Sequence, residues 1–99
     1  MKWYQQGDVT IMPAEIPDEA KPVRSRVLAE GEATGHSHRV VGEAELLRLG
    51  YQLFLRVLGG NVRVIHDEHA EIAVPPGEYE IDRVREYDHF AEEARPVRD

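Results

Sequence analysis

Four of the five histidines in this 99-residue sequence fall in two close pairs. In the first pair, His36 and His38 are two residues apart, and side chains at this spacing in a β-strand point to the same side. In the second pair, His66 and His69 are three apart, so both can face one ion only across a bulge or at a strand end. Neutral imidazole nitrogens bind divalent transition metals such as Zn, Ni or Fe. The spacing therefore predicts a transition-metal site formed by His36, His38, His66 and His69.

Three carboxylates near these histidines are candidate catalytic groups. If a bound metal keeps an open coordination position, Glu43, Asp67 or Glu68 could serve as general base toward a metal-bound water. The same histidines also fit a site closed by protein ligands, or a role in packing and loops alone. The sequence leaves open whether the protein is an enzyme.

Composition excludes several other kinds of site. The chain has no cysteine, which rules out disulfides, thiolate zinc sites, iron–sulfur clusters and a cysteine nucleophile. Its 19 Asp and Glu outnumber its 12 Lys and Arg, giving a formal net charge of -7. We expect no nucleic-acid partner, because phosphate contacts need a basic face.

Nothing in the sequence resembles a targeting or membrane-spanning segment. The first residues, 1–6, lack the apolar stretch of a signal peptide, and no apolar run approaches the roughly 18 residues of a membrane span. We expect a cytoplasmic protein with no membrane contact. At 99 residues, we expect a single β domain covering residues 1–99.

The elements that must carry the histidines read as short strands separated by Gly and Pro. Residues 7–12 alternate in polarity and stop at Pro13, residues 23–30 can pair next, and residues 36–41 form a strand that carries the first histidine pair. Counting such segments gives six to eight strands. The prediction is an all-β fold, either a small barrel or a two-sheet sandwich.

The second histidine pair follows the clearest hairpin signal. Residues 51–58 and 61–66 flank Gly59-Gly60, a two-residue loop that suits hairpin turns. In the predicted register His66 lies opposite Leu53. The more apolar face then carries Leu53, Leu55, Val57, Val62, Val64 and His66.

The remaining segments are predicted as follows. Residues 71–74 and 79–81 form a second strand pair joined by Pro75-Pro76-Gly77, and residues 84–87 extend the last strand. Residues 43–49 fit either a strand or one helical turn. A possible short C-terminal helix begins at Asp88 and runs through residue 93.

One local motif resembles a known metal-binding family. His36-Ser37-His38, followed by Glu43 and Gly50, is similar to the first cupin motif, in which His and Glu bind a metal inside a small β-barrel. This resemblance covers about fifteen residues and implies a metal-dependent enzyme or a ligand-binding protein. The histidine of the second cupin motif is missing after Pro76-Gly77.

A broader resemblance is to a group of small uncharacterised bacterial proteins. It implies no activity, and it rests on the segments Gln6-Gly7-Asp8-Val9, Ala29-Glu30-Gly31-Glu32-Ala33-Thr34-Gly35-His36-Ser37-His38, His66-Asp67-Glu68-His69, Pro75-Pro76-Gly77-Glu78-Tyr79 and Arg85-Glu86-Tyr87-Asp88. A further alternative is a metal-free interaction module. Short strands leave unpaired sheet edges, and formation of a homo-oligomer is one way to cover them.

Overall fold

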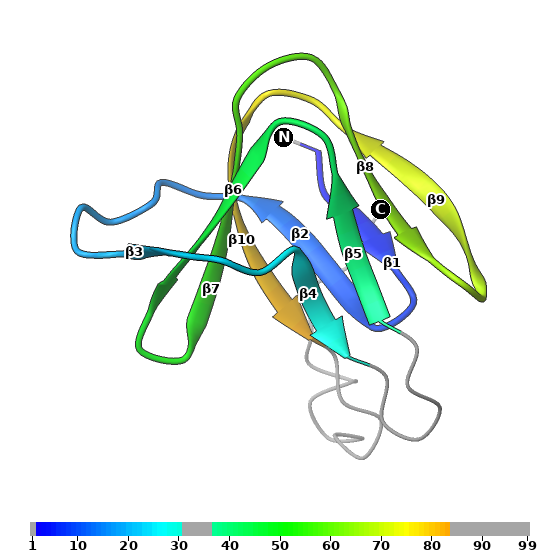
Figure 1. Ribbon diagram of the computed structural model, residues 1–99, viewed down its shortest axis with the longest axis horizontal. Helices are drawn as coiled ribbons and strands as arrows, with labels where there is room; N and C mark the ends of the chain where they lie inside the picture. The colour runs from blue at the N-terminus through cyan, green and yellow to red at the C-terminus, as the bar shows by residue number, and fades with distance from the viewer. Residues whose placement is uncertain (1, 31–36, 84–99) are drawn as a thin grey trace.

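The computed structural model describes residues 2–30 and 37–83, which form two antiparallel β-sheets (Figure 1). In spatial order, the six-stranded sheet consists of β1 (Tyr4–Gln6), β2 (Val9–Pro13), β10 (Gly77–Arg83), β7 (Gln52–Val57), β6 (Ala44–Leu49) and β3 (Lys21–Val23). The four-stranded sheet consists of β4 (Val27–Glu30), β5 (Ser37–Val41), β8 (Val62–His66) and β9 (His69–Val74).

The predicted all-β class is confirmed, and the architecture is the sandwich alternative. The barrel alternative is not supported, because the ten strands of the described residues stay in two separate sheets. The expected number of six to eight strands was too low. It missed short strands such as β1 and β3, each only three residues long. Edge strand β1 of the larger sheet lies beside edge strand β9 of the smaller one.

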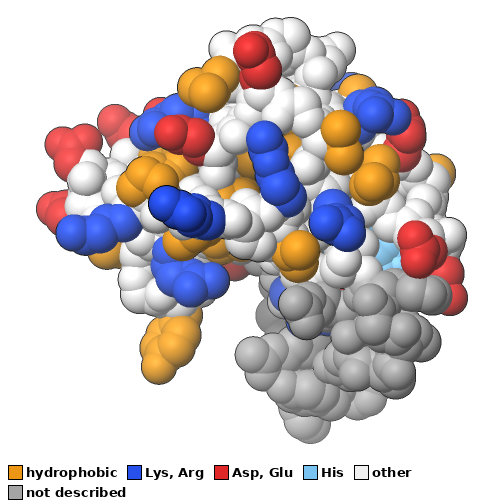
Figure 2. Space-filling model, in the orientation of Figure 1, with side chains coloured by type: hydrophobic (Ala, Val, Ile, Leu, Met, Phe, Trp, Pro, Cys, Tyr) orange, Lys and Arg blue, Asp and Glu red, His pale blue; other side chains and the backbone are white. Residues whose placement is uncertain are grey.

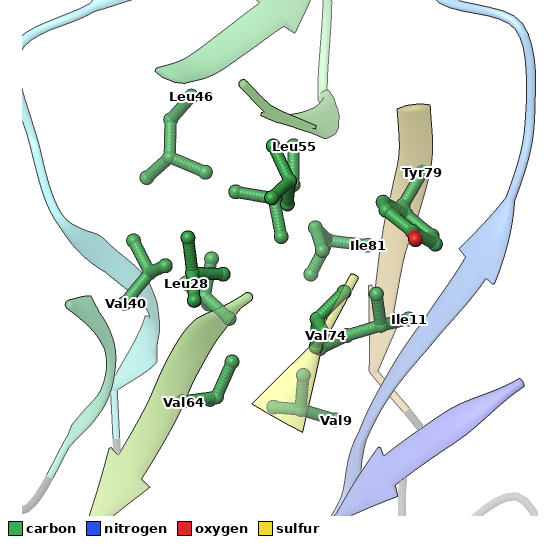
Figure 3. Close-up of a cluster of buried hydrophobic side chains, with 12 residues drawn as sticks. Val9, Ile11, Leu28, Val40, Leu46, Leu55, Val64, Val74, Tyr79 and Ile81 are labelled. Carbon is green, nitrogen blue, oxygen red and sulfur yellow. The ribbon is translucent and has the colours of Figure 1, made fainter. Parts of the chain in front are cut away.

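The core lies between the two sheets (Figure 3). Alternate residues of strands such as β5 and β10 point inward, since successive side chains of a strand face opposite sides. Burying each of these side chains contributes roughly 1.5 to 3 kcal/mol before the entropy cost of ordering the chain. The fully buried members are Val9, Ile11, Leu55, Val62, Val64 and Val74.

The prediction of a hairpin across Gly59-Gly60 is wrong. Strand β7 pairs with β6 and β10, whereas β8 pairs with β5 and β9, so this connection crosses from one sheet to the other. Leu58 donates its backbone N–H to the carbonyl of Glu43 at 3.0 Å instead of pairing with Asn61. Four apolar residues predicted for one hairpin face are nevertheless buried in the sandwich core, and Leu53 is half-buried against it; the four are Leu55, Val57, Val62 and Val64.

The prediction that the strands on either side of Pro75-Pro76-Gly77 pair with each other is also wrong. Strand β9 belongs to the smaller sheet and β10 to the larger one, so this turn makes a second crossing. The ambiguous segment 43–49 contains a strand, β6, rather than a helical turn. The predicted extension over 84–87 and the helix over 88–93 lie outside the described residues.

Within residues 2–30 and 37–83, no helix is long and apolar enough to cross a membrane.

Candidate metal centre

Three of the four candidate histidines lie at one end of the smaller sheet. His38 is near the start of β5, His66 ends β8 and His69 begins β9. His38 keeps the inward alternation of Val40, and His66 keeps that of Val64, so both rings point into the end of the sandwich. The fourth candidate, His36, lies outside the described residues.

A register shift between β8 and β9 brings His69 to the same side as His66. Val64 pairs with Ile72, and in an unbroken ladder His66 would then oppose Ala70. The observed partner of His66 is His69, because β9 contains one extra residue at this point. The sequence had indicated that this pair needs a bulge or a strand end to converge, and the structure has both.

The three imidazoles are neighbours. The ring centroids of His38 and His66 are 4.3 Å apart, those of His66 and His69 are 4.7 Å apart, and those of His38 and His69 are 5.9 Å apart. His38 is buried, with 2% of its surface exposed, whereas His66 is half-buried and His69 is exposed. In Figure 2, histidine surface is visible at the right of the molecule beside acidic side chains. The cluster therefore extends from the core to solvent.

Gln6, the last residue of β1, fixes the orientation of His38. Its side-chain amide donates to the carbonyls of Val64 at 2.9 Å and Ala70 at 2.9 Å, which lie where the β8–β9 ladder is interrupted. With both amide hydrogens used, Gln6 Oε1 accepts from His38 Nδ1 at 2.9 Å. This arrangement assigns the Nδ1–H tautomer to neutral His38 and directs its Nε2 lone pair toward the turn between β1 and β2.

Asp8 lies in that turn, on the Nε2 side of His38. Its Oδ1 is 3.5 Å from His38 Nε2, and its Oδ2 accepts from Arg83 Nε at 2.9 Å. Partial burial tends to raise the pKa of Asp8, but the hydrogen bond and positive charge of Arg83 lower it overall. The Asp8 carboxylate is therefore ionised at neutral pH.

Burial lowers the pKa of His38. Repulsion from a charged His66 adds to this effect, and attraction by Asp8 opposes it. His38 is consequently neutral at pH 7, which is the form that can bind a metal.

His66 has the opposite tautomer. Its Nδ1 accepts the backbone N–H of Glu68 at 3.0 Å, so the proton of neutral His66 is on Nε2. Coordination through Nε2 of His66 requires its proton to move to Nδ1, and His66 then gives up this hydrogen bond.

In the described part of the chain, no group of three or more His, Asp or Glu side chains already has the geometry to hold a metal ion. The rings of His38, His66 and His69 have converged, but the orientation of His66 differs from that of a ligand. Metal binding by this cluster requires the donor nitrogens of these side chains to rearrange.

The chain matches one known family over residues 5–84, a domain of unknown function called DUF8820. The chain belongs to the DUF8820 family. The matched range includes every residue of the cluster described above. No curated protein and no solved structure matches the chain.

The structure separates one candidate catalytic residue from the histidines. Glu43 follows the far end of β5, and its carboxylate lies against Gly59. The cupin resemblance implied that Glu43 joins His38 at a metal, and the structure does not bring them together. Asp67 and Glu68 form the turn between His66 and His69, so both remain beside the cluster.

Sequence reasoning missed three polar residues of the site, Gln6, Asp8 and Arg83. All three belong to the larger sheet or its β1–β2 turn, and they approach the histidines only because the sheets pack together. One signal was available for Gln6, since it lies two residues from Tyr4 on a strand whose inward face is otherwise apolar.

Proposed function

We propose that this protein binds one divalent transition-metal ion through His38, His66 and His69. The observation that carries the proposal is the convergence of three imidazoles from three strands, with ring centroids 4.3, 4.7 and 5.9 Å apart. Three histidine ligands on neighbouring strands are a common arrangement for zinc and related metals.

The ring spacing fits a shared ion. Imidazoles that bind one tetrahedral metal at about 2.0 to 2.1 Å have ring centroids roughly 5 Å apart. The three observed separations lie on both sides of this value. The donor nitrogens do not yet form a metal-binding group, so the imidazoles must reorient before they can share an ion.

Three acidic side chains lie around the cluster, and one of them, Asp8, is also paired with Arg83. Asp8 is adjacent to His38, and Asp67 and Glu68 lie in the turn that joins the other two histidines. His38 is held neutral by burial, so one ligand does not need to lose a proton before binding. Imidazole nitrogens select Zn, Ni, Cu or Fe(II) over Mg or Ca, which prefer oxygen ligands.

Zinc titration of tag-free, chelator-stripped protein tests this proposal. We expect calorimetry to give one zinc ion per chain, no response to magnesium, and loss of high-affinity binding in His38→Gln and His69→Gln. Glu71→Gln is the control, because Glu71 is an exposed carboxylate of β9 that pairs with Arg63 at 3.3 Å. The control should bind zinc like the wild type.

A wild type that binds no zinc, nickel or copper would contradict the proposal. The histidines would then have a purely structural role, and the protein would fit the metal-free interaction module. His36→Gln belongs in the same series, because the sequence predicts His36 as a ligand although it lies outside the described residues.

A further inference from the structure

We infer that Asp8 is the fourth ligand of this site and that the bound ion fastens the two sheets together, leaving no coordination position for a substrate. This inference rests on the proposed metal binding. It assigns a role to a residue outside the four histidines predicted from the sequence, and it identifies the site as structural rather than catalytic.

The distance between Asp8 and His38 is that of two ligands on one metal. A nitrogen at about 2.0 to 2.1 Å and an oxygen at about 2.0 to 2.2 Å from a tetrahedral ion lie roughly 3.4 Å apart. Asp8 Oδ1 and His38 Nε2 are 3.5 Å apart. A direct charge-assisted hydrogen bond would be shorter, about 2.7 to 2.9 Å. The observed separation therefore allows both atoms to bind one ion.

The outer partners of both ligand atoms are already in place. Gln6 accepts the Nδ1 proton of His38, which leaves Nε2 for a metal. Arg83 occupies Oδ2 of Asp8 at 2.9 Å, which leaves Oδ1 facing His38. Metal-binding histidines and carboxylates in proteins are held by outer hydrogen bonds of this kind.

A carboxylate ligand would also reduce the net positive charge of the metal site. Three neutral imidazoles leave the full double charge of the ion in a partly buried place, where charge is costly. One carboxylate ligand halves that net charge. Asp8 Oδ1 lies 3.5 Å from His38 Nε2, a candidate ligand atom.

The four proposed ligands come from both sheets, so a bound ion would link the two sheets. His38, His66 and His69 belong to the smaller sheet, and Asp8 belongs to the turn between β1 and β2 of the larger sheet. An ion held by all four would connect the sheets at an end where polar side chains replace the apolar core. Four protein ligands are typical of structural zinc sites, whereas catalytic sites keep a position for water.

Asp8→Asn in the full-length protein tests the inference, with Glu71→Gln as the matched control. We expect Asp8→Asn to weaken zinc binding by more than about 100-fold, the upper range for loss of a mere outer partner. Glu71→Gln should be unchanged. Zinc should raise the melting temperature of the wild type and the control far more than that of Asp8→Asn.

Cobalt(II) substitution gives a second measurement, and its result for the wild type does not depend on any variant folding. We expect the visible spectrum of the cobalt-loaded wild type to be intense, as for four-coordinate cobalt, and unaffected by added azide. Asp8→Asn should admit azide and change its spectrum.

The possible failures are distinguishable. If the wild type binds neither zinc nor cobalt, the proposed function fails, and this inference fails with it. If the wild type binds zinc but Asp8→Asn matches Glu71→Gln, or if azide changes the wild-type cobalt spectrum, only the assignment of Asp8 is overturned. Loss of binding in His36→Gln with retention in Asp8→Asn would assign the fourth position to His36.

Discussion

Gly7 lies directly against the imidazole of His69. A Cβ atom on Gly7 would be 2.6 Å from His69 Nε2, a separation that real Cβ atoms do not adopt. Gly7 also has a φ of +60°, a backbone conformation that side chains disfavour. The close approach of the β1–β2 turn to the cluster therefore depends on glycine at this position.

Gly7→Ala should displace His69 and weaken zinc binding by roughly tenfold or more, as expected when a ligand loses its support. Gly60→Ala is a matched control, because Gly60 has the same φ of +60° but nothing within 4 Å of its Cβ position. Both variants should lose about 1 to 2 kcal/mol of stability from the backbone conformation. Calorimetric zinc titration and urea unfolding measure the two effects, and equal zinc affinities in the two variants would contradict the close contact.

Gln6→Leu should be strongly destabilising. The change removes the partner of His38 Nδ1 and both donors to the carbonyls of Val64 and Ala70, in a buried place. Leaving these three buried polar groups unpaired should lower the free energy of unfolding by roughly 2 to 4 kcal/mol. Gln5→Leu, at an outward-facing position of the same strand, should change stability by less than about 0.5 kcal/mol. Similar urea midpoints for the two variants would argue against the Gln6 network.

The metal-free protein should lose stability as the pH falls. The pKa of His38 lies below its ordinary value of 6.5 in the folded state, so the unfolded chain binds more protons at mildly acidic pH. The stability linked to His38 is thus present above pH 6.5 and is lost as the pH falls through the folded-state pKa. The groups that act on it are His66, His69, Asp8 and Arg83.

Melting temperatures of chelator-treated protein between about pH 7.5 and pH 5.5 measure this loss. His38→Gln should lose less stability than the wild type over the same interval, because it removes the group whose protonation favours unfolding. An identical loss in the two proteins would mean that His38 is not the group responsible.

The sequence was sufficient to predict the fold class and to single out the histidines that form the cluster, because both follow from local patterns. Alternating polarity marked most strands, and the spacing of the histidines indicated how each pair must be presented. His66 and His69 do meet at a strand end next to a register shift, as their spacing required.

Strand pairing was not predictable in the same way. A Gly-Gly loop after Leu58 fits a tight hairpin and equally fits a crossing between sheets, since glycine permits both backbones. What decides between them is that β7 gains two partners, β6 and β10, in the larger sheet. The contacts of His38 with Gln6 and Asp8 span about thirty residues of sequence and depend on that assembly.

Anomalous diffraction at the zinc edge, from crystals of tag-free protein loaded with one equivalent of zinc, tests the central claim most directly. We predict one strong peak within about 2.0 to 2.1 Å of a ring nitrogen of each of His38, His66 and His69. The His66 ring should have turned away from the backbone N–H of Glu68. Zinc bound elsewhere on the chain, or three histidines that keep their metal-free contacts with no peak between them, would contradict it.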